Sequence, residues 1–259
     1  MIDRLTPTDK FLIPLSPSVD SFPLPQRFNL NHIPHPLAVI AAKDLQKYLQ
    51  TQNDWVHNFG LIPGQKGKVV GKMFGVLVVR TLQNDMGYIA AFSGKLANSN
   101  QHMKFVPPVF DGLCNQSFVN QGMRELSRIN LTIKDLEVTI PAGYDDQIRL
   151  LKSRRKKHSI SLQQKIFDQY FFLNQLGEKK SLNEIFKKAS YKNPPSGAGE
   201  CAGPKLLQYA FQNQMRPIAL TEFWWGLSPK SNQWKHGDYY LCCKEKCQPI
   251  LDHMLEGLV

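Results

Sequence analysis

The sequence predicts an α+β or α/β fold in which helices pack against a mixed sheet, with a long helical insertion in mid-chain. Three observations predict it. Stretches with strand character alternate along the chain with stretches whose apolar residues recur at helical spacing. The run Val76–Val79 is apolar at every position, which is typical of a strand buried on both faces. Hydrophobic residues make up 42% of the 259 residues, enough for a sizeable core.

The N-terminal segment, residues 1–36, contains seven prolines, and proline removes backbone donors and disfavours helix. We therefore expect an extended arm that lies on the surface of the protein. A helix is predicted over residues 37–49, because its apolar residues share one side and Pro36 stands at a favourable first-turn position.

The first half of the α/β body is predicted to span residues 37–115. After the helix, residues 68–80 and 88–93 have strand character, and the polar stretch 83–87 between them is typical of a turn. We therefore expect a β-hairpin whose first strand is central in the sheet.

Residues 116–190 are predicted to be a helical insertion. Apolar residues mark one helix over 118–129, and a longer helix is expected over 146–177. The sequence Ser181-Leu-Asn-Glu184 matches a capping box and predicts one more short helix.

The second half of the body, residues 191–259, begins with a loop rich in Pro, Gly and Ser over 192–203. A helix opening at Pro204, a strand over 217–225 and a helix over 249–255 are expected to follow.

A formal net charge of +11 favours an anionic partner, and nucleic acid is the usual one. Six basic residues are concentrated within nine positions of the insertion: Arg149, Lys152, Arg154, Arg155, Lys156 and Lys157. They are either a stripe that binds phosphates or the solvated face of a helix. The charge of the whole chain favours contact with RNA or DNA.

No apolar run is long enough to span a bilayer, and the first residues lack the apolar segment of a signal peptide. We therefore expect a cytoplasmic protein without a membrane partner, whose cysteines are thiols or metal ligands rather than disulfides. The signatures of P-loop and dinucleotide-binding proteins, HExxH metalloproteases and GxSxG hydrolases do not occur.

Four of the five cysteines lie in the last quarter of the chain. Cys243 and Cys247 would share a face if they lay on a helix, and Cys201 is a third candidate ligand of a zinc ion. Cys242 would point elsewhere, and His236 and His253 are candidates for a fourth ligand. Buried thiols without a metal explain the spacing equally well.

An aromatic group with nearby basic residues offers a second interpretation. Its members are Phe223, Trp224, Trp225, Trp234, Tyr239 and Tyr240. Such residues either stack on unpaired bases or belong to the core, and the core is their commoner place.

The order of elements resembles that of zinc-dependent nucleobase deaminases, in which one ligand begins a helix and two cysteines begin the next. That family carries a proton-shuttling Glu two residues after the first ligand, where this chain has Gly203. Glu200 would have to act instead. The resemblance therefore implies a structural zinc held by Cys201, Cys243 and Cys247, with an active deaminase as the alternative.

Several blocks in the same order resemble the N-terminal region of long-form bacterial RluA-like pseudouridine synthases. They are Ala91–Leu96, Phe105–Asp111, Pro194–Ala210, Glu222–Gly226, Ser228–Lys230, His236–Gly237 and Cys243–Leu251. In that family a catalytic domain with an Arg-Leu-Asp motif follows this region, and the motif does not occur in this chain.

The resemblance implies an accessory RNA-binding module without synthase activity and without a catalytic residue of its own. Its expected partners are rRNA or tRNA and a separate pseudouridine synthase domain. Besides the deaminase, a metal-free protein-interaction domain remains as an alternative.

Overall fold

The computed structural model describes residues 9–15, 22–28, 30, 33–114, 117–139, 145–191, 193–229 and 233–257. Much of the proline-rich arm and Lys230 therefore lie outside the described residues.

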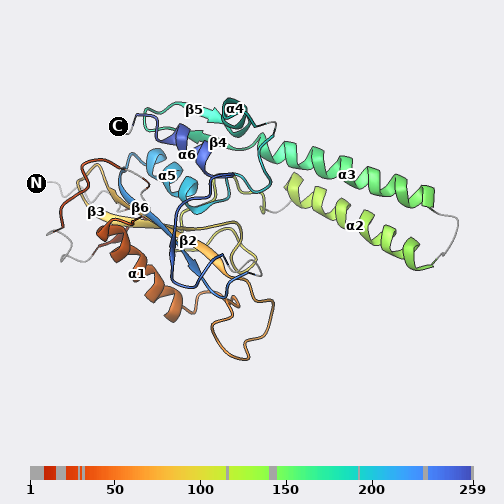
Figure 1. Ribbon diagram of the computed structural model, residues 1–259, viewed down its shortest axis with the longest axis horizontal. Helices are drawn as coiled ribbons and strands as arrows, with labels where there is room; N and C mark the ends of the chain where they lie inside the picture. Colours follow the sequence, from red (N-terminus) through yellow and green to blue (C-terminus); the bar gives the residue numbers. More distant parts are fainter. Residues whose placement is uncertain are drawn as a thin grey trace, which may run out of the picture.

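A five-stranded antiparallel sheet forms the centre of the protein (Figure 1). Its spatial order is β1 (Ile13–Pro14), β3 (Met86–Phe92), β2 (Lys72–Arg80), β6 (Arg216–Trp225) and β7 (Tyr239–Tyr240). Of the two predicted classes, α+β and α/β, the structure shows α+β. Every described pairing is antiparallel, so the expectation of a mixed sheet is corrected.

Strand β2 is central, as its apolar sequence predicted. Residues Phe74–Val79 are buried, and alternate side chains enter two different cores. Val76 and Val78 face the first helix, whereas Leu77 and Val79 face the elements on the other side. Burial on both faces is the reason why this strand shows no polar alternation.

Helix α1 (Pro36–Thr51) covers one face of the sheet, close to the predicted span. His35 caps its N-terminus by accepting a hydrogen bond from Leu37 N through its ring nitrogen. Leu37, Ala41 and Leu45 are fully buried against the sheet. Tyr88 on β3 donates a 2.5 Å hydrogen bond to Asp44, which ties the helix to the sheet.

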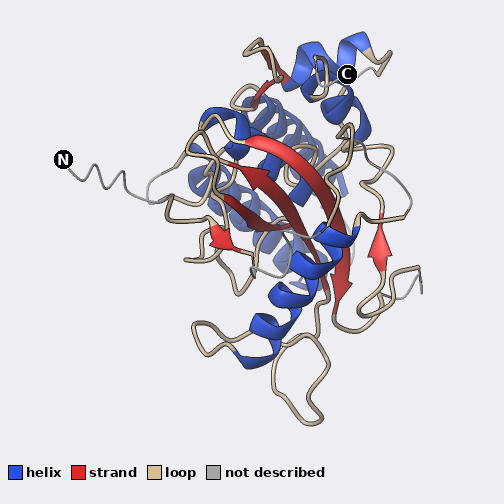
Figure 2. Ribbon diagram, turned by 90° about the vertical axis from the view of Figure 1, so that its left-hand side faces the viewer, coloured by secondary structure: helices blue, strands red, loops and turns tan. Residues whose placement is uncertain are grey.

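The other face is covered by α5 (Ala202–Gln212), α6 (Gln248–Met254), α4 (Leu182–Lys188) and a small hairpin. Figure 2 shows helices on both sides of the central sheet. The capping box at α4 is confirmed, since Ser181 and Glu184 exchange side chain–backbone hydrogen bonds. No helix in these described ranges is both long and apolar enough to cross a membrane.

Of the predicted insertion, α2 (Phe118–Thr139) and α3 (Asp145–Phe167) form a helical arm that projects from the body (Figure 1). Ile129, Ile133 and Leu162 are buried between the two helices. Gly122 lets them approach closely, because a Cβ there would lie 2.7 Å from the Leu162 side chain.

The prediction of one helix over 146–177 is wrong in its second part. The helix ends at Phe167, and a hairpin of β4 (Phe171–Leu173) and β5 (Lys179–Ser181) follows. The turn is closed by Asn174, whose side chain accepts from Glu178 N, and by Gly177 with φ of +83°. Tyr170, which matches helical spacing, is instead buried in the core that α5 and α6 share, whereas Leu176 is exposed.

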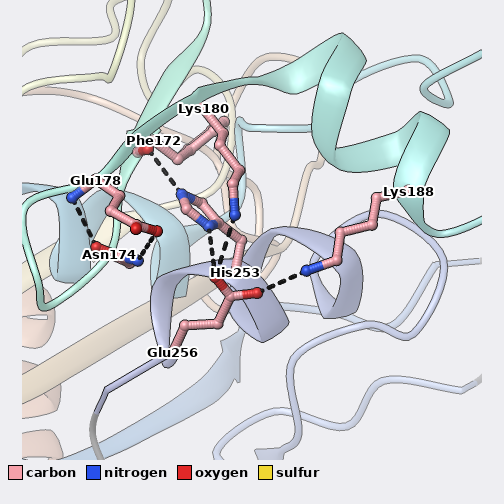
Figure 3. Close-up of polar contacts among 7 residues, drawn as sticks. All are labelled: Phe172, Asn174, Glu178, Lys180, Lys188, His253 and Glu256. Carbon is pink, nitrogen blue, oxygen red and sulfur yellow. Dashed lines mark hydrogen bonds and ion pairs between the residues drawn. The ribbon is translucent and has the colours of Figure 1, made fainter.

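An ionic cluster ties the end of the chain to this hairpin (Figure 3). Glu256 accepts hydrogen bonds from Lys180 at 3.2 Å and from Lys188 at 2.9 Å. His253 Nε2 donates to Phe172 O at 3.1 Å, and its Nδ1 lies 3.5 Å from the Glu256 carboxylate. The two lysines lower the pKa of Glu256 to about 2.

We expect Glu256→Gln to lower the free energy of unfolding above about pH 4.5, and to have little effect on it at pH 2. The folded-state pKa of about 2 lies below the ordinary value of 4.5, so the stabilisation is lost as pH falls through this window. Urea unfolding at several pH values measures it, with Glu245→Gln at an exposed turn as the control. A pH-independent difference between Glu256→Gln and the wild type would contradict the assignment. The effect is small, because the side chains are partly exposed.

Candidate metal centre and nucleic-acid interface

The three candidate ligands lie at the N-termini of two helices. Cys201 is the N-cap of α5 and uses its thiol for no capping bond. Cys243 begins a single turn in which Cys247 N donates to Cys243 O at 3.1 Å, and Cys247 is the N-cap of α6. The two segments, about forty residues apart in sequence, are brought together because α5 and α6 pack on the same face of the sheet.

The sulfurs of Cys201, Cys243 and Cys247 lie within 4.8 Å of one another. Those of Cys243 and Cys247 are 3.4 Å apart, and all three cysteines are free thiols. Tetrahedral zinc with Zn–S bonds of about 2.3 Å requires sulfurs about 3.8 Å apart. The donor set and its spacing therefore fit a zinc ion with little rearrangement.

The thiols are coupled to one another. Hydrogen bonds from Cys201 and Cys247 lower the pKa of the Cys243 thiol. The contact with Cys243, together with burial, raises the pKa of Cys201. Contacts with Cys201 and Cys243, together with burial, raise the pKa of Cys247. The three thiols therefore titrate as one coupled group, and a bound zinc ion would displace their protons.

Neither candidate histidine joins this cluster. His236 accepts a hydrogen bond from Gly226 N and packs on Trp225, and His253 belongs to the ionic cluster of Glu256. Among the residues with described positions, the cysteine group has three members. Cys242, the expected bystander, is buried but stands outside it.

Glu222 is a buried carboxylate beside the cysteines that the sequence analysis missed. It lies on β6 and is 3% exposed. It accepts a 2.8 Å hydrogen bond from Gly203 N, two residues after Cys201, and another from the Cys242 thiol, next to Cys243. One carboxylate thus connects both ligand-bearing segments to the sheet. Burial raises the pKa of Glu222 to about 7.

The same contacts explain why position 203 is Gly. A Cβ there would lie 2.9 Å from Cys242 Sγ and 3.5 Å from Glu222 Oε1. The space that a side chain at 203 would enter is therefore filled by Cys242 and Glu222. The signal in the sequence was a single acid in the middle of the apolar strand 217–225.

Glu200 is engaged on another side. Its carboxylate accepts a hydrogen bond from the Tyr170 hydroxyl and lies 3.5 Å from the ammonium group of Lys205. Lys205 is 3% exposed and also donates to Phe92 O. Glu200 therefore anchors the loop before α5, and burial lowers the pKa of the Lys205 ammonium group that it partners.

The predicted basic stripe lies on α3, where four of its six residues have polar partners. Arg149 pairs with Asp146, Lys152 with Glu137 and Arg154 with Glu125. Arg155 donates to Asn130 on α2. Lys156 and Lys157 are exposed, and neither forms an ion pair with any residue that the structure describes.

One face of the helical arm is a groove of about 780 Å³ between α2 and α3. We call it the groove face. Its polar residues are Ser127 and Asn130 from α2, and Lys152, Ser153, Arg155, Lys156 and Ser159 from α3. Arg154, Lys157 and Arg149 do not line it. The structure thus divides the stripe between the groove face and the rest of the arm.

The predicted aromatic group falls into a buried part and a partly exposed part. Phe223 and Trp225 are buried, so the interpretation as core holds for them. Trp224 and Trp234 are half-buried and stacked at a centroid distance of 6.0 Å, and Tyr240 meets Trp234 edge-on at 4.6 Å.

Comparisons of the chain with protein-family models, with curated proteins and with solved structures find no match.

Proposed function

We propose that this chain is an accessory RNA-binding module, related to RluA-like RNA pseudouridine synthases, with a structural zinc ion at Cys201, Cys243 and Cys247. The observation that carries the RNA-binding part is the groove face of the arm. It combines three basic side chains with four hydroxyl or amide side chains on a surface that projects from the body. The relation to the synthases rests on the sequence blocks given above.

The groove face has the chemistry of a phosphate and sugar contact. Lys and Arg neutralise phosphates, and Ser and Asn supply hydrogen bonds to phosphate and sugar oxygens. The ion pair of Lys152 with Glu137 is exposed on both sides, so exchanging it for a phosphate costs little. Arg155 is already oriented by Asn130.

The zinc would be structural, because its ligands would join two segments that lie about forty residues apart in sequence and share no disulfide. It would fasten the N-terminus of α5 to that of α6, next to the core formed by Leu206, Ile250 and Leu251. Cys247 is 1% exposed, so this ligand is shielded from solvent.

We expect the triple variant Lys152→Ala, Arg155→Ala, Lys156→Ala to bind a short RNA hairpin at least ~10-fold more weakly near 0.1 M salt. The slope of log affinity against log salt should fall by about 2 to 3, since roughly three phosphate contacts are lost. Fluorescence anisotropy over a series of salt concentrations measures both.

The matched control is Arg124→Ala, Arg128→Ala, Lys157→Ala, which removes the same charge from the same arm outside the groove lining. It should weaken binding much less. Equal losses in the two variants would mean that binding follows total charge and not the groove. Absence of RNA binding by the wild type would refute the proposal.

A second candidate, the zinc-dependent deaminase, is favoured by one observation. Glu222 places a carboxylate beside Gly203, the position at which deaminases carry their proton-shuttling Glu. Glu222, rather than Glu200, would then carry the proton. The test is the release of ammonia from cytidine or adenosine. Release by the wild type that disappears in Glu222→Gln would support the deaminase function. If the wild type releases no ammonia, the deaminase is refuted and the RNA-binding module stands as the proposal.

A further inference from the structure

A separate cavity lies on the opposite face of the sheet from the cysteines. It has a volume of about 360 Å³ and lies between the C-terminal end of α1, residues 52–65 and Trp225. This size is within the range of small-molecule sites. Neither the arm nor the metal centre contributes a residue to its lining.

The cavity is electrically neutral, although the chain carries a net charge of +11. No Asp, Glu, Lys or Arg lines it. Its one titratable group is His57, whose Nε2 donates to Val70 O at 2.7 Å and whose Nδ1 accepts from Ala97 N at 3.4 Å. Both ring nitrogens are thus used by the neutral imidazole, and burial lowers the pKa of His57. A charged ligand would find no counter-charge among the lining residues.

Four aromatic side chains line the cavity beside four aliphatic ones, and hydrogen bonds within the chain hold this segment in place: the aromatic ones are Trp55, His57, Phe59 and Trp225. The ring of Phe59 lies 4.6 Å from that of His57 and 6.1 Å from that of Trp55. Asn58 donates to Gln65 O and Gly67 O and accepts from Gly60 N, which fastens this irregular segment. A long segment without helix or strand that is nevertheless tied by its own side chains is typical of a binding loop.

Polar groups at the rim are available to a ligand. Gln50 and Asn53 line the cavity, are exposed, and form no side-chain hydrogen bond within the described part of the chain. A carboxamide offers a donor and an acceptor side by side, which matches the edge of a nucleobase.

We propose that this cavity binds an unpaired nucleobase, with the aromatic walls against the ring and Gln50 and Asn53 on its polar edge. The proposal extends the proposed RNA-binding function by naming what a second site would recognise. Neutral walls, flat apolar surfaces and two free amides are the features that an uncharged heterocycle requires. The base belongs either to a free nucleoside or to an unpaired position in RNA, and the chemistry is the same.

The test is titration of the full chain with adenosine and uridine, followed through the indole N–H signals of Trp55 and Trp225 by NMR. We expect saturable shifts of these signals. Asn53→Ala and Gln50→Ala should each weaken binding roughly fivefold, the effect of one lost hydrogen bond. Gln169→Ala, an exposed amide away from the cavity, is the control and should bind as the wild type does.

A second arm of the experiment compares an RNA hairpin carrying one unpaired base with its fully paired counterpart. Preference for the unpaired base, lost in the Asn53→Ala, Gln50→Ala double variant, identifies RNA as the source. Nucleoside binding without RNA binding would keep this inference and refute the proposed function. Absence of saturable nucleoside shifts overturns the inference, even if benzene binds in the cavity.

Discussion

Cys247→Ser is expected to abolish stoichiometric zinc binding and to lower the melting temperature of the protein. Three sulfurs within 4.8 Å are the whole ligand set that the described residues offer, so loss of one leaves two. Structural zinc contributes apparent binding free energies of about 10–16 kcal/mol in small domains. This chain has extensive cores of its own, so we expect it to remain folded and to lose ~3 kcal/mol or more.

Zinc content by atomic absorption and thermal unfolding with and without added zinc measure the two effects. Cys114→Ser is the matched control, because Cys114 is an exposed free thiol outside the cluster. It should keep one zinc per chain and the melting temperature of the wild type. Less than one zinc per chain in the reduced wild type, or one zinc per chain in Cys247→Ser, would contradict the assignment of the metal centre.

Glu222→Ala is expected to have the second largest effect. It leaves Gly203 N–H without its acceptor in a space that water does not reach, and it releases Cys242 as well. Loss of a buried charge-assisted hydrogen bond of this kind costs about 3 kcal/mol. Because both ligand-bearing segments lose their connection to β6, the affinity for zinc should fall together with the stability. A cobalt titration, read from the thiolate absorption, measures the affinity.

Glu222→Gln separates the charge from the contacts, since its amide oxygen still accepts from Gly203 N. Burial raises the pKa of Glu222 from 4.5 to about 7, so the folded metal-free protein binds this proton more tightly than the unfolded chain. The stabilisation is complete below about pH 4.5 and is lost as the pH rises to 7, on the order of 3 kcal/mol. Relative to Glu222→Gln, the metal-free wild type should therefore lose stability across this window. Parallel stability curves for the two proteins would contradict the raised pKa.

Local sequence patterns were enough for most elements. The apolar face of 37–49, the hairpin around 83–87 and the capping box at Ser181 correspond to α1, to β2 with β3, and to α4. Each depends on neighbours a few residues apart, which act in the same way wherever the segment lies in the fold. The end of α3 was misjudged, since Leu173 and Leu176 match helical spacing but belong to the hairpin region that packs beside α6.

The candidate site was predictable only in its ligands. Cysteine is distinctive enough that Cys201, Cys243 and Cys247 could be selected from residue type and element order, whereas Glu222 looked like any acid in a strand. Its role depends on Gly203 and Cys242, which approach it only after α5 packs on the sheet. The pairs Lys152–Glu137 and Arg154–Glu125 likewise exist only because α2 folds against α3.

The sequence by itself therefore determined that helices pack on a sheet, the order of most elements, the basic character of the arm and the three candidate thiols. Only the tertiary structure decided that the sheet is antiparallel, that the three thiols meet, which carboxylate stands beside them, which basic residues face the groove and where a neutral cavity opens. Periodicity and residue type act over one or two turns of chain, whereas these features join residues tens of positions apart through packing. Contacts of that kind are formed when the layers close, and no local pattern encodes them.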